Sequence, residues 1–199
     1  MNPRITRMAM ILVVATALAS APQAATNTTS GDIGGSGLTD GTFDLSATQL
    51  ALQKAAFLAV NGTSLTTGAT VPKGTLVKFL IYLHNSTAAA ALDTTIQDVL
   101  DSTFQYQAGT MKASTLDDTG DAWCPGGTCD SEAIFTEVDT NGAALGDGDA
   151  VVAPTDADAG SYTSGSTTLD FGDGNNANNA PLDVPTDNVW AVIFTVRVN

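Results

Sequence analysis

Apolar residues at every second position mark the stretch that most constrains the fold. Within residues 75–85, the sequence TLVKFLIYLHN places Val77, Phe79, Ile81 and Leu83 two residues apart. A period of two in β-branched and aromatic residues is typical of a strand with one buried face. This segment therefore predicts a strand whose four apolar side chains enter a core.

The end of the chain predicts a second, more deeply buried strand. In residues 189–198, the sequence VWAVIFTVRV has an apolar residue at every second position from Trp190 to Val198, and the opposite face is apolar at its start. A strand that is apolar on both faces has to be covered on both. We expect residues 113–160 of the same chain to cover the second face, and a partner chain is the alternative.

The other segments add shorter strands. Residues 45–60 are interpreted as a strand rather than a helix, because Asn61-Gly62 follows as a turn signal between β elements. Residues 113–160 loosen into loops around one apolar patch. Together these elements predict an all-β fold, an antiparallel β-sandwich of about 7–9 strands over residues 45–199, with 113–160 as an acidic, loop-rich insertion.

The first 25 residues have the pattern of a secretory signal peptide. Two arginines precede an apolar stretch, residues 8–19, and small residues follow it. Cleavage after Ala21, Ala24 or Ala25 stays open, as does a retained anchor, although the apolar stretch is shorter than the roughly 20 residues that span a bilayer. The mature chain is predicted to have no membrane span and to be secreted, extracellular or at the cell surface, with the periplasm as an alternative.

Composition narrows the possible partners. The chain has 21 acidic and 7 basic residues and a net charge of −14, and removal of both signal-peptide arginines changes the charge to −16. Such acidity argues against nucleic-acid binding. Residues 26–44 are rich in Gly, Ser, Thr and Asn and predict a flexible leader.

Several short motifs follow one another along the chain in the same order as in a known family. They are VPKGT at 71–75, HN at 84–85, TTIQDVL at 94–100, FQYQAG at 104–109, TLDFG at 168–172 and FTVRV at 194–198. This series resembles the DUF11 family of bacterial and archaeal surface proteins over residues 47–198, with 113–160 as a departure. The resemblance implies an immunoglobulin-like sandwich in an extracellular or cell-surface protein, without catalytic residues.

The two cysteines predict a disulfide. Cys124 and Cys129 lie in WCPGGTC, and an even pair in an exported chain is typical of a structural bridge. Redox catalysis is not favoured, because the spacing is not Cys-x-x-Cys. A zinc site is not expected, because the single histidine, His84, is far away in sequence and is predicted to be exposed at a strand end.

Clustered aspartates offer a possible metal site. Asp147, Asp149, Asp156 and Asp158 supply carboxylates two residues apart in each pair, and such hard oxygen ligands suit Ca²⁺. The twelve-residue EF-hand pattern with its terminal Glu is incomplete. Solvated turns capped by Asp are the alternative. Calcium is therefore a possible cofactor, and no other cofactor is predicted.

These observations favour a non-catalytic structural module, since no serine lies in a nucleophile elbow. We expect self-association or contact with other extracellular surface proteins. One hypothesis is that the leader 26–44 inserts as a strand into a neighbouring subunit and builds a filament or matrix, and a merely disordered leader is the alternative. The alternative is a calcium-dependent ligand- or glycan-binding module with Trp123 or Tyr162 as stacking residues. A hydrolase that uses two aspartates is the third hypothesis.

Overall fold

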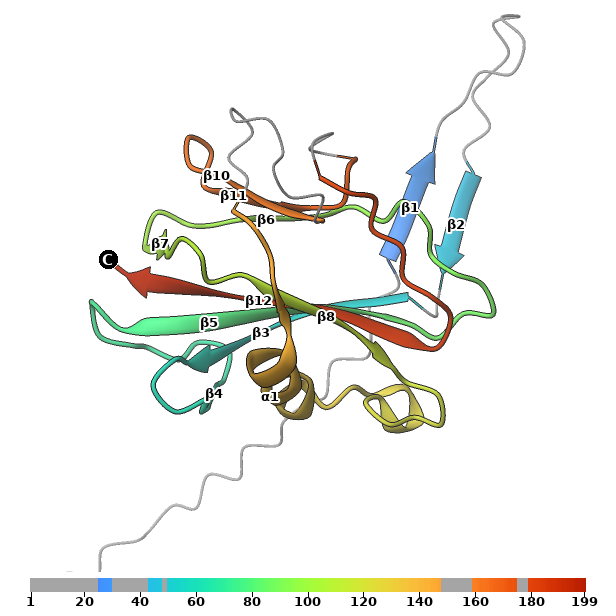
Figure 1. The fold of residues 1–199 in the computed structure, drawn as a ribbon, viewed down its shortest axis with the longest axis horizontal. Coiled ribbons are helices and arrows are strands. Elements are labelled where there is room, and N and C mark those ends of the chain that lie inside the picture. The colour runs from blue at the N-terminus through green and yellow to red at the C-terminus, as the bar shows by residue number, and fades with distance from the viewer. Residues whose placement is uncertain (1–24, 30–42, 48–49, 148–158, 175–178) are drawn as a thin grey trace, which may run out of the picture.

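The computed structural model describes residues 25–29, 43–47, 50–147, 159–174 and 179–199. Two antiparallel sheets, of seven and three strands, pack against each other as a sandwich (Figure 1). The all-β prediction is therefore confirmed. The predicted signal peptide lies outside the described residues except for Ala25.

The strands of both sheets are short except at the centre of the larger one. The seven-stranded sheet contains β3 (Leu50–Leu58), β4 (Ser64–Leu65), β5 (Leu76–Asn85), β7 (Phe104–Tyr106), β8 (Lys112–Asp117), β9 (Ala143–Ala144) and β12 (Asn188–Val198). The three-stranded sheet contains β6 (Ile96–Val99), β10 (Gly160–Thr163) and β11 (Thr168–Phe171). In the larger sheet, β12 pairs with β5 on one side and with β8 and β7 on the other.

The two predicted alternating strands are therefore direct neighbours. The register of β5 and β12 places Val77 opposite Val196 and Ile81 opposite Val192. One core lies between the sheets and takes the predicted faces of both strands, including Val77, Ile81, Leu83, Trp190, Val192, Phe194 and Val196. The alternation of the sequence thus gives the correct inward face for both strands.

A second core covers the other face of the larger sheet. It joins Val189, Ala191 and Ile193 of β12 and Leu80 and Tyr82 of β5 to residues 124–138. Figure 1 shows the helix α1 (Ser131–Asn141) on the side of the larger sheet opposite β6, β10 and β11. The prediction that residues 113–160 of the same chain cover this face is confirmed.

The interpretation of residues 113–160 as loops is wrong, because they contain β8, a short 3-10 turn (Pro125–Gly127) and α1. The carboxylate of Asp130 caps α1 by accepting hydrogen bonds from the backbone N–H groups of Glu132 and Ala133, both 3.0 Å long. Three apolar residues share the buried helix face: Ile134, Phe135 and Val138. Both the cap and the helical spacing are present in the sequence, between flanks rich in Asp and Gly.

The N-terminal segment also differs from its prediction. The structure pairs β1 (Ala25–Thr29) with β2 (Phe43–Ala47) in an antiparallel two-stranded sheet. Both ends of the predicted leader therefore have strand backbone, and the strand predicted over 45–60 begins its pairing with β5 at Leu50. Across the part of the chain that is described, no helix has the length and apolarity to cross a membrane.

Gly172, directly after β11, is a position where only glycine fits. Its φ is +84°, and a Cβ there would lie 2.1 Å from the carbonyl oxygen of Thr94. We expect Gly172→Ala to lower the free energy of unfolding by about 3 kcal/mol, since left-handed strain and a backbone clash add together. Urea unfolding measures this. Gly165→Ala is the matched control, because nothing lies near its Cβ, and equal losses for both variants would contradict the prediction.

Candidate functional site

The two cysteines form the predicted disulfide at the face of the larger sheet that α1 covers. Cys124 and Cys129 are bonded to each other, and Cys124 is fully buried. The loop between them turns through Gly126 and Gly127, which both have positive φ. The backbone N–H of Asp130 donates to the carbonyl of Trp123 and closes the loop at 2.9 Å. The bridge therefore lies directly before the capped start of α1.

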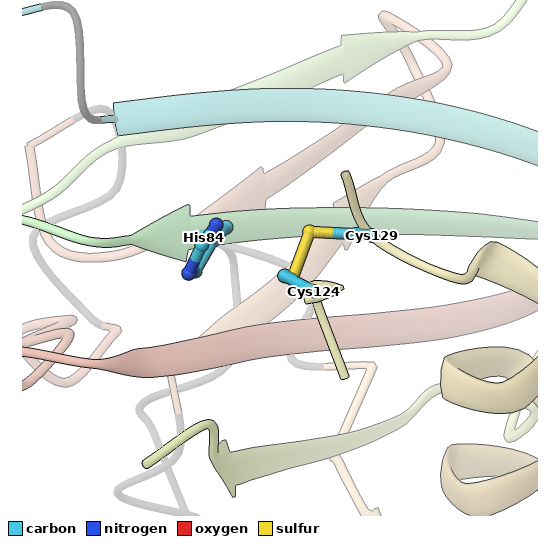
Figure 2. A group of neighbouring side chains, drawn as sticks. All are labelled: His84, Cys124 and Cys129. Carbon is cyan, nitrogen blue, oxygen red and sulfur yellow. A yellow bond between two sulfur atoms is a disulfide. The ribbon is translucent and has the colours of Figure 1, made fainter. Parts of the chain in front are cut away.

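His84 lies beside this disulfide, near the end of β5 (Figure 2). The prediction that His84 is exposed is wrong, because only 5% of its surface is accessible. His84 follows Tyr82 by two positions on β5, so both side chains lie on the same face of the sheet. That face is covered by residues 124–138, which the strand pattern alone does not reveal.

Asp118 connects the histidine to the disulfide loop. It is 4% exposed and directly follows β8, and its Oδ2 lies 3.1 Å from Nε2 of His84. Its Oδ1 accepts hydrogen bonds from the backbone N–H groups of Trp123, at 2.5 Å, and Cys124, at 3.0 Å. Burial of a carboxylate is costly unless its oxygens are paired, and here both are.

The cluster has the composition of a transition-metal site. The ligand atoms of His84, Cys124 and Cys129 all lie within 4.8 Å of one another. The prediction that His84 is too far from the cysteines to share a metal site with them is therefore wrong, because the fold brings these residues together. In the disulfide form the two sulfurs are bonded to each other, whereas a metal requires thiolates.

Only one of the four predicted calcium ligands lies in the described residues. Asp147 accepts a hydrogen bond from the Tyr106 hydroxyl on Oδ1 and one from the Gly109 backbone N–H on Oδ2. Burial first, and then this hydrogen bond, raise the pKa of Tyr106. Asp147 therefore helps to anchor β7. Asp149, Asp156 and Asp158 lie outside the described residues, and calcium binding stays a prediction.

Other acidic residues have partners within the fold. Asp98 lies 2.6 Å from the Lys54 ammonium and Asp139 lies 2.6 Å from that of Lys78. Asp170 accepts a hydrogen bond of 2.8 Å from Gln97. These contacts hold strands or the helix together and do not support the hydrolase hypothesis.

The two predicted stacking residues are both engaged in packing. Trp123 is half-buried against the second core, and its Nε1 donates to the Asp117 carbonyl at 3.1 Å. The ring of Tyr162 lies 4.3 Å from that of Tyr106, so one of its faces is covered. The structure therefore gives no support to a glycan platform built on these rings.

One long backbone edge of the larger sheet has no partner among the described strands. β4 pairs only with Ala56 and Phe57 of β3, and no described strand is hydrogen-bonded to the edge of β3 from Leu50 to Ala55, although β1 lies near β3. The side chain of Leu52 on this edge is 51% exposed. Open edges of this kind are templates for pairing with another chain.

An apolar groove of about 250 Å³ lies beside this edge. Its lining includes Ala56, Leu65, Phe79 and Phe104, together with Lys54. The Lys54 ammonium is 4.3 Å from the centre of the Phe79 ring, where the cation–π attraction holds it. The edge and the groove together form a surface that suits an extended segment.

Alkaline pH should destabilise the fold through Tyr82. Burial first, and then the negative charge of Asp130, raise the pKa of Tyr82 from 10.0 to about 12. Between these values the unfolded chain loses the phenol proton and the folded chain keeps it, so stability is complete below pH 10 and falls as the pH rises to 12. Melting temperatures across this range measure the effect.

Tyr82→Phe removes this titration and should flatten the alkaline slope, although it also loses the hydrogen bond to Gln53 at all pH values. Tyr106 keeps its own contribution in that variant. An identical slope in wild type and variant would contradict the assignment to Tyr82.

Comparisons with known proteins do not assign the chain to a family. No family model, no curated protein and no solved structure matches the chain.

Proposed function

We propose that this chain is a non-catalytic structural module, exported from the cell, that self-associates through strand pairing at the open edge of β3. The observation that carries the proposal is the edge of β3 from Leu50 to Ala55, which pairs with none of the described strands and lies beside an apolar groove. Addition of a strand to such an edge uses backbone hydrogen bonds for affinity and a neighbouring pocket for a side chain. A filament or matrix subunit needs a repeatable contact of this type.

The backbone of β3 presents its free groups in a regular pattern. The N–H of Leu58 donates outward to the Thr63 carbonyl, whereas the N–H of Ala59 donates inward to Leu76 at the start of β5. Because these directions alternate along an antiparallel strand, Leu50, Leu52 and Lys54 direct their N–H and C=O groups away from β5. These residues offer the groups that a donor strand would pair with.

The N-terminal leader of a second copy is the proposed donor. Its strand β1 (Ala25–Thr29) pairs with β2 of its own chain, and exchange would replace this pairing with one to the neighbour's β3. The five-residue strand is similar in length to the open edge. Exchange of an existing strand is a low-cost route to association, because it reuses the same type of backbone bonds.

Export is part of the proposal and rests on the signal-peptide pattern of residues 1–25. The disulfide supports it, because such bridges persist in oxidising compartments. The resemblance to DUF11 surface proteins points in the same direction. The mature acidic chain would then act outside the cytoplasm, among copies of itself.

The test compares the assembly state of the mature chain with that of a chain lacking residues 26–44. Size-exclusion chromatography and negative-stain microscopy should show oligomers or polymers for the first and monomers for the second. Monomers in both samples would overturn self-association. Polymers in both would overturn the leader as the donor.

A point variant tests the edge itself. Leu52→Pro removes an outward N–H without breaking a bond to β5, because proline is tolerated on an edge strand where its nitrogen faces solvent. We expect Leu52→Pro to abolish assembly while the melting temperature changes little. Leu52→Ala, which keeps the N–H, is the matched control and should still assemble if backbone pairing supplies most of the affinity.

A further inference from the structure

We propose that reduction of the Cys124–Cys129 disulfide converts the cluster beside it into a binding site for Zn²⁺, with His84 as the third protein ligand. The inference is independent of self-association. It rests on the proximity of the three ligand atoms, all within 4.8 Å of one another, on a face where His84 and Cys124 are buried. Figure 2 shows the histidine on β5 with the disulfide next to it on the covering loop.

The residue types and their spacing suit zinc. Cysteine thiolate and neutral imidazole are its usual protein ligands, and structural sites space their cysteines by two to four residues. Here four residues separate Cys124 from Cys129. Ligand atoms of a tetrahedral zinc site lie roughly 3.3–3.8 Å apart, so small movements would suffice. Gly126 and Gly127 at the centre of the loop have positive φ and give its backbone freedom to adjust.

Asp118 completes the surroundings of the proposed ion. Its Oδ2 lies 3.1 Å from Nε2 of His84, a distance at which a carboxylate fixes the orientation of the imidazole or joins the metal as a further ligand. Its Oδ1 holds the backbone N–H groups of Trp123 and Cys124, so the loop stays attached when the sulfur bridge opens. His84 and the backbone of Cys124 are therefore positioned by contacts that do not depend on the disulfide.

The chemistry balances with a thiol reductant. Two thiol molecules reduce the bridge, passing two electrons and two protons to the sulfurs of Cys124 and Cys129 and forming one disulfide between themselves. Zn²⁺ then binds the two sulfurs as thiolates and displaces both protons to solvent. The site is closed to metal when the bridge is oxidised and open when it is reduced.

The experiment measures Zn²⁺ binding by the mature chain in both redox states. A phosphine reductant opens the bridge without adding a competing thiol, and a chromogenic chelator reports free Zn²⁺. We expect the reduced chain to bind one Zn²⁺ per molecule, at least tenfold more tightly than the oxidised chain, with release of protons and a higher melting temperature. Equal affinity of the two redox states would overturn the proposal.

Two further measurements distinguish Zn²⁺ binding at the folded three-residue site from Zn²⁺ binding by the two thiols alone. His84→Gln in the reduced chain should weaken Zn²⁺ binding at least tenfold, and the reduced wild type in denaturing urea should show a similar loss. Because the urea measurement needs no variant, it applies even if His84→Gln does not fold. Unchanged affinity in urea would overturn the proposal, and so would unchanged affinity in a folded His84→Gln variant.

Discussion

Asp118→Ala is expected to lower the free energy of unfolding by about 3–5 kcal/mol, because each buried polar group that loses its hydrogen-bond partner costs roughly 1–3 kcal/mol and this carboxylate serves three of them. The variant would leave the buried His84 without its carboxylate and two backbone N–H groups, those of Trp123 and Cys124, without an acceptor. Urea unfolding followed by far-UV circular dichroism measures the loss, because tryptophan fluorescence would combine Trp123 in this loop with Trp190 in the core between the sheets.

Asp117→Ala is the matched control for this prediction. Asp117 is the exposed neighbour of Asp118, and its carboxylate accepts a hydrogen bond from the backbone N–H of Thr119. Hydrogen bonds from Thr119 lower the pKa of this carboxyl, but the site remains in solvent. We expect a much smaller loss than for Asp118→Ala, because surface substitutions of this kind change stability little. Similar losses for both variants would show that Asp118 does not hold the loop as proposed.

Phe135→Ala is expected to have the other large effect, a loss of about 3–5 kcal/mol. Phe135 is 4% exposed, and its ring stacks on that of Phe57 with centroids 3.9 Å apart. Truncation leaves a cavity between α1 and the larger sheet, because the neighbouring side chains only partly collapse into it. Thermal and urea unfolding measure the change.

The same variant tests what covers the second face of β12. If α1 is the cover, loosening it should expose Val189 and Ile193 and increase the binding of a hydrophobic dye before the main unfolding transition. Thr136→Ala, on the exposed side of α1, is the control and should bind no additional dye. Wild-type stability and no dye binding in Phe135→Ala would mean that the helix contributes little to this core.

Much of the sandwich could be predicted because the alternation of apolar residues within a strand identifies that strand and its buried face. The apolar positions of residues 77–83 and 190–198 repeat with the period of the pleat, so each strand specifies its buried face locally. The disulfide was equally predictable, since it joins two cysteines only five residues apart. These features depend on short stretches of sequence.

Other features depended on contacts between distant residues. Asn85 marked the end of a strand in the sequence, yet its side chain is buried and donates hydrogen bonds to the carbonyls of Ala89, Val184 and Pro185. Two of these acceptors are about a hundred residues away, and strand alternation contains no signal for them. The helix α1 was missed for a different reason, because its cap and apolar spacing were local but were outweighed by polar flanks.

By itself, the sequence determined the fold class, the inward faces of the two central strands and the covalent bridge. Only the tertiary structure decided that His84 is buried beside that bridge and held by Asp118, because the site forms where β5, the end of β8 and the disulfide loop meet. It also decided which backbone edge is open, since that depends on the length of β4. Alternation assigns a side chain to a face, but packing determines what lies against that face.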